Sequence, residues 1–544
     1  LVLLGPQSLD ELEALVVPMF APVPNNDFTQ PQISEPLFAE GTLPALLQIK
    51  PQATSRQLQV LFPLADYREH YDVKPMSYIG NLVGHEGEGS LLSQLKAEGL
   101  AESLAAGAGL GWRGGSLFGI TITLTEEGVV EYQRALQLIF AYLDMLREEG
   151  PREWLYDEQS RLAELSFRFK EEGNSMSYVT GLSGSMLYYA PDDILRGPYV
   201  MRNYQPQMIT DALSRMVPEN ALVILQEQGV ETDRVSVHYQ VPYSLRTVGD
   251  EELAAWRTEV DAGVLALPAA NPFIAEDTSL VKISPDNPSH PELALEQGRQ
   301  RIWFMQDETF RVPRGAMYIN FRSPLVGQSP EQAASAVLYT ALLRDRVNEL
   351  TYPALLAGLQ FSFYKHAQGI SMRVSGYDDK QFVLLDDLLE VIAAPGFDQQ
   401  RFENIRKDMI RSLENAVAKR PSSQVMDDLR EAVLHAHWGE QVLVEVLQEM
   451  TLEDLERYAQ GFWASATAEA LIFGNYTASM VQELSGRLDR VVPDSAPPEL
   501  EELRVTRLQT GERGLYPVDV AHDDAVLAWY MQGADNTWED LSLI

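Results

Sequence analysis

The same order of strand-like and helix-like segments occurs twice along the chain, about 260 positions apart. Alternating segments at Gln57–Leu64 and Gly315–Leu325 open the two copies. A second strand pattern follows in each copy, at Leu117–Thr125 and at Ile370–Gly376. A unit of about 250 residues is far longer than a solenoid repeat, so each copy is predicted to be a domain with its own sheet.

Amphipathic helices are predicted directly after these second strands, because apolar residues recur every three or four positions. A further helix is predicted in each copy, at Glu153–Phe169 and at Gln399–Ala416. The first helix of the second copy is expected to end at Pro395-Gly396. The apolar positions are Val129, Tyr132, Leu136, Ile139, Leu143 and Leu146 in the first copy, and Phe382, Leu385, Leu388, Leu389 and Ile392 in the second.

Each copy closes with a strand and a helix, and partial copies are predicted at both ends of the chain. Leu1–Gly5 resembles the closing strands Ala221–Gln226 and Ala470–Gly474, and Ser8–Val17 resembles the closing helix Ser479–Leu488. The strand-like Val518–Gln532, which includes Ala525–Met531, resembles the opening of a unit. The expected fold class is α+β, with repeated domains that each have a mostly antiparallel sheet and helices packed on one face.

Composition excludes several classes of protein. With 544 residues the chain exceeds a single core, which stops growing at roughly 250–300 residues. Its net charge of −37 disfavours nucleic acid as a partner, because phosphate would be repelled. The absence of cysteine excludes disulfides, Cys-bound zinc and iron–sulfur clusters. No apolar run approaches the ~18 residues of a transmembrane segment.

Motifs for metal or nucleophilic chemistry are missing from the sequence. None of the eight histidines is four positions from another, so neither HExxH nor HxxEH occurs. His435 and His437 would point in different directions on a helix and are interpreted as ordinary helix or interface residues. Gly181–Gly184 fails as a GxSxG motif, because Ser185 stands at the second glycine position, and a loop is expected there.

Two glycine-rich segments remain as candidate binding features. Gly107–Gly115 is predicted to be a flexible turn before the strand Leu117–Thr125, rather than a cofactor loop. Glycine there would let another backbone approach, which suits an edge strand open to peptide addition. Gly84–Gly89 precedes a predicted helix, Ser90–Glu98, and has two interpretations. Either its glutamates favour the helix N-terminus, or His85 and the adjacent backbone bind a peptide.

Several long motifs in the same order resemble the insulinase/pitrilysin (inverzincin) family of zinc metallopeptidases. The resemblance runs over essentially the whole chain. The most specific piece, YIGNLVGHEGEGSLLSQLKAEG at Tyr78–Gly99, resembles the hallmark of the family's second domain. The other pieces are Leu267–Leu280, Arg301–Pro324 with Trp303, Phe310 and Pro313, then Tyr352, Ala357–Leu359 and Gly376–Lys380.

The resemblance implies four homologous domains in two halves around a closed chamber. It divides the chain into residues 1–33, the C-terminal tail of the first, catalytic domain; 34–246, the second domain with a substrate exosite; 247–285, a linker between halves; 286–493, the third domain; and 494–544, the start of the fourth. The linker assignment agrees with a segment rich in Pro, Ala and acidic residues.

The family's catalytic zinc binds an HxxEH motif, whose place would lie upstream of Leu1. Arginine and tyrosine side chains that assist the reaction would lie downstream of Ile544. Zinc is therefore expected in the full-length protein, whereas this chain is expected to hold no metal and no catalytic residue. The resemblance assigns an exosite, where substrate adds as a strand, to His85, Glu86, Gly87, Gly114 and Gly115.

The resemblance implies a zinc-dependent endopeptidase that degrades peptides or small proteins enclosed in its chamber. This chain would supply chamber wall and substrate anchoring, and it would be inactive alone. The alternative is a non-catalytic chamber or partner subunit that only binds peptides. Expected partners are peptide substrates and the upstream catalytic segment, with a homodimer left open. Bacterial relatives of this architecture imply a periplasmic location.

Overall fold

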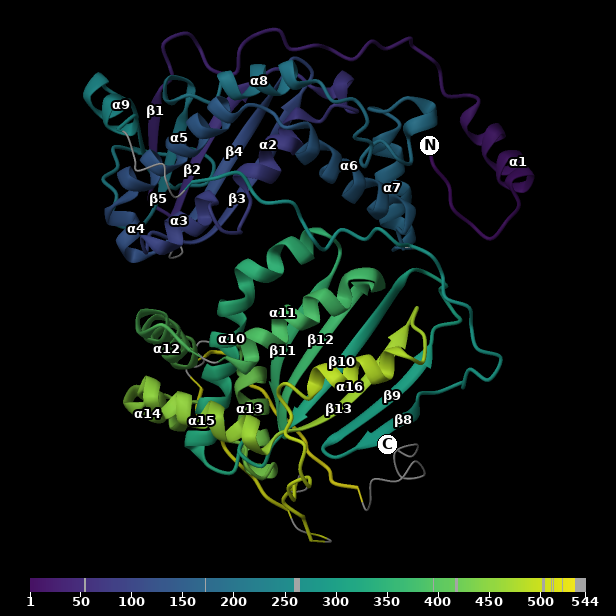
Figure 1. Cartoon of the computed structure of the whole chain (residues 1–544). Helices are drawn as coiled ribbons and strands as arrows, with labels where there is room; N and C mark the ends of the chain where they lie inside the picture. The colour runs from purple at the N-terminus through teal and green to yellow at the C-terminus, as the bar shows by residue number, and fades with distance from the viewer. Residues whose placement is uncertain are drawn as a thin grey trace. The chain divides into compact units, whose positions relative to one another are not determined.

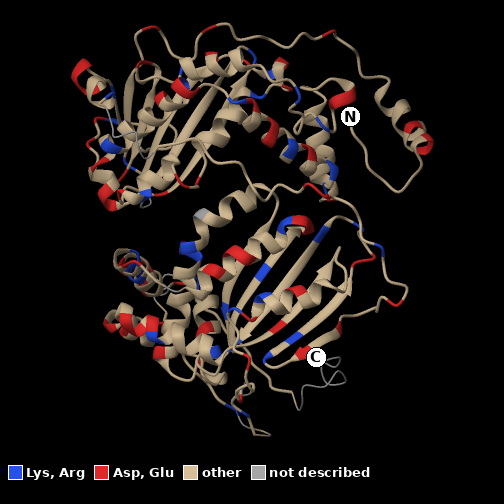
Figure 2. Cartoon of the chain, viewed as in Figure 1, with Lys and Arg blue, Asp and Glu red and all other residues tan. Residues whose placement is uncertain are grey.

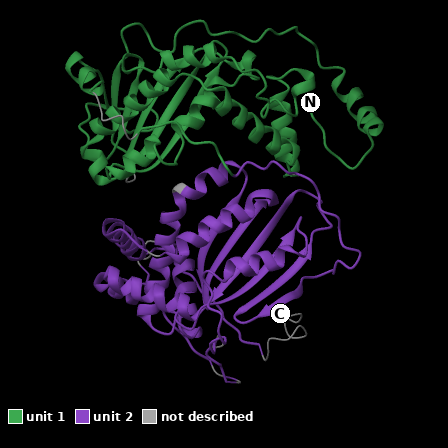
Figure 3. Cartoon of the chain, viewed as in Figure 1, with its two compact units in different colours: residues 1–272 green, residues 273–544 purple. Residues whose placement is uncertain are grey.

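The computed structural model describes residues 1–52, 55–171, 173–258, 265–394, 396–415, 419–500, 504–509, 511, 513–520 and 522–533 (Figure 1). The chain divides into two compact units, Leu1–Pro272 and Phe273–Ile544, referred to below as the first and second unit (Figure 3). Each unit is built around one mixed sheet.

The sheet of the first unit has the strand order β3-β4-β2-β5-β1-β7-β6. All its pairs are antiparallel except the parallel pair of β1 and β5. The bounds are β1 Ala45–Ile49, β2 Gln57–Leu64, β3 Ala101–Trp112, β4 Gly115–Leu124, β5 Leu222–Gln226, β6 Arg234–Val235 and β7 Pro242–Thr247.

Helices cover the apolar face of this sheet. Phe62 of β2 and Phe118 of β4 pack with Leu136 in one core cluster, and all three side chains are fully buried. The helices are α1 Leu9–Phe20, α2 Pro75–Val83, α3 Leu91–Ala97, α4 Glu126–Val130, α5 Tyr132–Glu149, α6 Glu153–Arg168, α7 Ser175–Ser185, α8 Pro206–Ser214 and α9 Asp250–Trp256.

The sheet of the second unit has the order β11-β12-β10-β13-β9-β8, and only β13 and β9 are parallel. The strands are β8 Glu292–Gln297, β9 Gln300–Gln306, β10 Arg314–Arg322, β11 Gln360–His366, β12 Gly369–Tyr377 and β13 Thr467–Gly474. The helices are α10 Pro330–Leu356, α11 Gln381–Ala393, α12 Gln399–Glu414, α13 Pro421–Val433, α14 Glu440–Glu449, α15 Leu452–Ser465 and α16 Met480–Leu488.

Side-chain alternation gives this second sheet two different faces. Met317, Ile319 and Phe321 of β10 are fully buried on the face that the helices cover. Tyr318 points to the opposite face and is 37% exposed. Figure 1 shows α11 and α16 lying across the covered face.

The predicted α+β class is confirmed, and so are the main repeated elements. The strand predicted at Gln57–Leu64 has those bounds as β2, and the segment Gly315–Leu325 contains most of β10. Helices α5, α6, α11 and α12 follow the strands as predicted. The sheets are mostly antiparallel, as predicted, and each contains one parallel pair among its described strands.

The terminal strands predicted at Leu1–Gly5 and within Val518–Gln532 are wrong. The described residues of both segments have no strand conformation, although the helix predicted at Ser8–Val17 is present as α1. An alternating apolar pattern becomes a strand only when a partner strand accepts its hydrogen bonds, and neither segment pairs within the described part of the chain. Pro395, predicted to end α11, and Ala416, predicted to end α12, lie outside the described residues.

The segment predicted to be a linker begins with a docked helix. Within Thr247–Pro285, α9 places Trp256 in the core of the first unit, where the indole is 1% exposed. Its ring stacks on Phe140 at 5.9 Å, and its Nε1–H donates to Gln133 Oε1 at 2.7 Å. This part of the segment therefore contributes to the core rather than acting as a flexible connection. Residues 259–264 lie outside the described residues.

The later part of the same segment is fastened to the second unit by side chains. Asp379 Oδ2 accepts the N–H groups of Glu276 and Asp277 at 2.9 and 3.3 Å. Asn475 accepts the N–H of Val281 at 2.8 Å and donates to the carbonyl of Ser279 at 3.0 Å. These bonds satisfy backbone groups that have no strand partner. We call this set of contacts the clasp.

Asp378 lies beside the clasp and is an energetically unfavourable carboxylate. Burial, with a smaller contribution from the adjacent Asp379 and Asp277, raises the pKa of Asp378 to about 6. Asn475 Nδ2 donates to its Oδ2 at 3.1 Å, whereas Oδ1 is buried with no hydrogen-bond partner among the described residues. A carboxylate in this position costs free energy whenever it is ionised.

Replacement of Asp378 by Asn is expected to stabilise the chain at pH 8 by about 1–2 kcal/mol, after allowance for solvent screening. The folded-state pKa lies above the unfolded value of about 3.9, so wild-type stability falls as pH rises from about 4 through 6. The variant lacks this dependence. Urea unfolding at pH 5 and pH 8 measures the effect, and a variant less stable than wild type at pH 8 would contradict it.

The Trp256→Ala variant tests the docking of α9. Loss of a fully buried indole is expected to cost about 3–5 kcal/mol, because a cavity remains in the core. Trp154→Ala is the matched control, since that side chain is 41% exposed and its loss should change stability by less than about 1 kcal/mol. Urea unfolding followed by circular dichroism compares the two. Equal effects would show that α9 is not part of the core.

Candidate functional site

Strand β3 forms one edge of the first sheet and is the candidate binding feature. Its residues pair with β4 on one side, and within the described part of the chain no strand pairs with its other side. The strand is twelve residues long, and its central part, Leu104–Gly111, contains only Leu, Ala and Gly. Most of these side chains are exposed. A long edge strand of this kind is a template for pairing with another chain.

Helix α2 packs unusually close to this edge strand. A Cβ placed on Gly80 would lie 3.1 Å from Gly107 Cα and 3.2 Å from the Ala106 carbonyl oxygen. Gly84, one turn further, caps the helix, and a Cβ placed on it would lie 3.6 Å from the backbone nitrogen of Ala106. The two glycines lie on one side of the helix, so backbone meets backbone without intervening side chains.

The segment His85–Gly87 connects α2 to α3 in a tight loop. The His85 ring is 8% exposed, and its Nδ1 accepts the N–H of Gly87 at 3.0 Å. Burial lowers the pKa of His85 to about 4, so the imidazole is neutral at pH 7. A Cβ on Gly87 would lie 2.6 Å from His85 Cε1, so a larger residue there would displace the His85 ring. Glu86 is half-buried in the same loop.

Gly114 lies in the turn between β3 and β4, and Gly115 is the first residue of β4. The N–H of Gly114 donates to Asp66 Oδ2 at 3.1 Å, and Gly114 has a φ of +122°. The side-chain hydrogen bond from Arg68 holds the pKa of Asp66 at about 2. The N–H of Ile33 donates to the carbonyl of Arg113 at 2.8 Å, which ties an N-terminal segment to this turn.

The predicted exosite residues therefore lie at two separate points along one strand. The loop at His85–Gly87 follows α2, whose end contacts β3 at Ala106, whereas Gly114 and Gly115 follow Trp112. Ala106 and Trp112 are six positions apart along the strand, about 20 Å at roughly 3.3 Å per residue. The structure does not bring the two groups into one compact site.

The predicted turn at Gly107–Gly115 is wrong for most of its length. Gly107, Gly109 and Gly111 lie inside β3, and only the last part of the segment turns. The strand predicted at Leu117–Thr125 is β4, which pairs with β3 and β2 on its two sides and so is not an edge. Small residues conceal a strand from a pattern search, since they lack the apolar alternation of a half-buried strand.

Other sequence candidates also occupy different structures from those expected. Gly181–Gly184, predicted to be a loop, lies within helix α7. His435 and His437 lie just after α13 rather than on a helix, and both are exposed. In the described ranges, no group of three or more His, Cys, Asp or Glu residues could hold a metal ion. None of the helices described has both the length and the apolar character needed to cross a bilayer.

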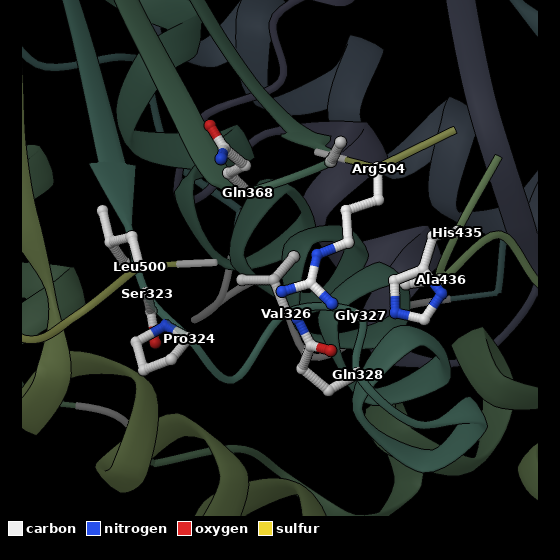
Figure 4. A pocket seen from close by; sticks show the side chains of 11 residues that line it. Ser323, Pro324, Val326, Gly327, Gln328, Gln368, His435, Ala436, Leu500 and Arg504 are labelled. Carbon is white, nitrogen blue, oxygen red and sulfur yellow. The ribbon is translucent and has the colours of Figure 1, made fainter. Parts of the chain in front are cut away.

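A small cavity of about 50 Å³ lies in the second unit beside His435 (Figure 4). Figure 4 shows the Arg504 guanidinium group near Gln328 and the His435 ring. The remaining lining includes Ser323 and Gln368. This volume holds a few water molecules and is too small for a peptide.

Family comparisons match the first unit and a large part of the second. Residues 1–162 match the peptidase M16 inactive domain, and residues 167–446 match the middle or third domain of peptidase M16. The chain belongs to the peptidase M16 family. The resemblance to insulinase/pitrilysin-type enzymes is thereby confirmed.

Curated relatives include the insulin-degrading enzyme of Homo sapiens, 33% identical over 87% of this chain and 47% of the relative. The A-factor-processing enzyme of Saccharomyces cerevisiae is 28% identical over 91% of this chain and 48% of the relative. The crystal structure of pitrilysin has the same fold, with a TM-score of 0.74 and 22% identity over 90% of this chain and 53% of that chain. The chain spans about half the length of the curated relatives it matches.

Gly114→Ala tests the turn at the end of the candidate edge. A methyl group there would lie 1.9 Å from the Ile33 carbonyl oxygen, and the positive φ disfavours alanine. We expect the free energy of unfolding to fall by about 1–3 kcal/mol and the Ile33 amide to exchange its hydrogen faster. Gly111→Ala is the matched control, because nothing lies within 4 Å of its added methyl group. Equal protection of Ile33 in both variants would contradict the contact.

Proposed function

We propose that this chain is part of a zinc-dependent endopeptidase and that β3 anchors the substrate peptide by strand addition. The observation that carries the proposal is the twelve-residue edge strand, which has a partner strand on one side only within the described residues. An extended peptide pairing there would continue the sheet. Membership of the M16 family supports a peptide as the occupant.

The composition of β3 supports binding with little sequence preference. Backbone N–H and C=O groups supply the affinity in strand addition, while pockets for side chains supply specificity. Alanine and glycine in Ala105–Gly109 offer few such pockets. An anchor of this kind suits an enzyme that degrades varied peptides.

The residues assigned to the exosite would act by shaping this edge. The His85–Gly87 loop fixes the end of α2, and the glycine face of α2 supports the middle of β3. Gly114 and Gly115 would set where the edge ends. His85 would remain neutral when substrate binds at pH 7, so it would contribute by its shape and hydrogen bonding rather than by charge.

The remaining assignments rest on the family. The chain would provide the second and third domains of a four-domain chamber, with 247–285 between the halves, and zinc would be held by a catalytic segment in the full-length protein. The periplasmic location stays a prediction, since one relative is described as peroxisomal. An in-frame HxxEH motif in the coding sequence upstream of Leu1 would support the endopeptidase. A start codon in that region with no HxxEH motif after it would favour the non-catalytic alternative.

N-methylated peptides test the strand addition directly. Alternate N–H groups of an added strand point toward β3, so methylation of one set should block pairing and methylation of the other set should not. We expect at least tenfold weaker binding for a fluorescein-labelled ten-residue peptide methylated in one register, and a change under twofold in the other. Fluorescence anisotropy with the full chain measures both. Equal losses in the two registers would overturn the proposal.

A further inference from the structure

The uncovered face of the second sheet has an unusual set of side chains. Strand pairing aligns Trp303, Leu471 and Tyr318 across β9, β13 and β10, and Arg373 of β12 continues the row. Leu293 of β8 extends it at the other end. Leu293 and Tyr318 are each 37% exposed and Arg373 is exposed, on the face opposite the helices. We call this row and its flanking arginines the open face.

Arginines lie beside the aromatic side chains of the open face. The guanidinium of Arg373 lies 5.1 Å from the centroid of the Tyr318 ring, and that of Arg301 lies 5.7 Å from Trp303. A guanidinium that lies over an aromatic ring keeps N–H donors available at its edge. The open face therefore presents donors next to apolar surface.

The charge of the open face opposes that of the whole chain. Overall, 79 acidic residues outnumber 42 lysines and arginines. On the open face three arginines, Arg301, Arg322 and Arg373, outnumber two glutamates. One of these, Glu469, is shared between Arg301 at 3.7 Å and Arg322 at 3.6 Å. Glu296, at the edge, also pairs with Arg301 at 3.4 Å. Figure 2 shows arginine or lysine positions along several of these strands.

We propose that the open face binds an acidic, extended segment of the peptide substrate. The inference rests on the proposed function, because it takes a peptide as the occupant, and it adds a second contact region with a stated preference. Carboxylates of the peptide would accept hydrogen bonds from Arg373 and Arg301. An apolar side chain between them would pack on Trp303 and Tyr318. Arginine pairs carboxylates in a planar, two-donor geometry that lysine cannot offer.

Charge complementarity favours an acidic peptide over a neutral one at the open face. An acidic peptide would be repelled by most of a surface with net charge −37, so a basic face would concentrate it locally. A basic or neutral peptide would gain no such contribution. The preference would weaken with salt, because exposed charges are screened over about 8–10 Å at physiological ionic strength.

Two synthetic peptides of twelve residues test the inference, identical except that four glutamates in one are glutamines in the other. We expect the full chain to bind the acidic peptide at least tenfold more tightly at 50 mM salt, and the difference to shrink below threefold at 0.5 M salt. The Arg301→Gln/Arg373→Gln variant should bind the acidic peptide about tenfold more weakly, while its affinity for the neutral peptide should change less than twofold. Fluorescence anisotropy gives the dissociation constants for both peptides.

The control variant Arg411→Gln/Arg457→Gln removes two exposed arginines from α12 and α15. It should leave both affinities unchanged, and thermal melting checks that each variant is folded. The inference would be overturned if the affinity for the acidic peptide fell equally in the control and the test variant. It would also be overturned if the test variant lost equal affinity for the two peptides. If another segment or a second copy covers the open face, neither peptide responds to the test variant, which also overturns it.

Failure of this inference is distinguishable from failure of the strand-addition proposal. N-methylation of the peptide in one register reports on β3 and affects the acidic and neutral peptides alike. The Arg301→Gln/Arg373→Gln variant reports on the open face and separates the two peptides. If methylation weakens binding in one register but the acidic and neutral peptides bind alike, only the β3 proposal is supported. If the acidic peptide binds more tightly but the methylation register has no effect, only the open-face proposal is supported.

Discussion

The close backbone contact between α2 and β3 is the interaction on which the candidate site depends. Gly80 approaches Gly107 so nearly that a single methyl group would fill the space between them. The contact supports an edge strand that has little side-chain packing of its own. His85 follows the end of α2 and is buried, and this burial keeps its ring neutral at pH 7. The geometry of helix, loop and edge follows from the absence of side chains at Gly80 and Gly84.

In the second unit, side-chain hydrogen bonds hold a segment that lacks regular secondary structure. Among the described residues, the segment before the unit's first strand pairs with no other strand, yet its backbone groups need hydrogen bonds. Side chains of Asp379, Asn475 and Gln306 provide them, and Ser284 N–H donates to Gln306 Oε1 at 2.7 Å. The clasp makes part of the predicted linker a fixed portion of the second unit. The unfavourable Asp378 carboxylate lies next to it, so the same polar cluster both fastens the segment and reduces stability.

Sequence reasoning succeeded where burial imposes alternation. Strands β2 and β4 each bury every second side chain against helices, and both were predicted closely. Strand β3 was not predicted because its centre consists of small, exposed residues. Helix α7 was not predicted because it buries no side chain. At the candidate site, the motif at Tyr78–Gly99 directed attention to His85. Gly80 and Gly84, four positions apart, carried a usable signal for close helix packing. Asp66 had none, since its role depends on a turn 48 positions away.

The single parallel pair in each sheet has a consequence for biosynthesis. Strands β2, β3 and β4 can pair soon after they are made, because they are neighbours in the chain, whereas Ala45 of β1 waits for Leu222 of β5. The same holds in the second unit, where β9 waits for β13. During translation each sheet therefore exists first as a partial structure with an open interior edge, until β5 or β13 is made and joins its two parts. A chaperone that covers such an edge would act on each unit in turn.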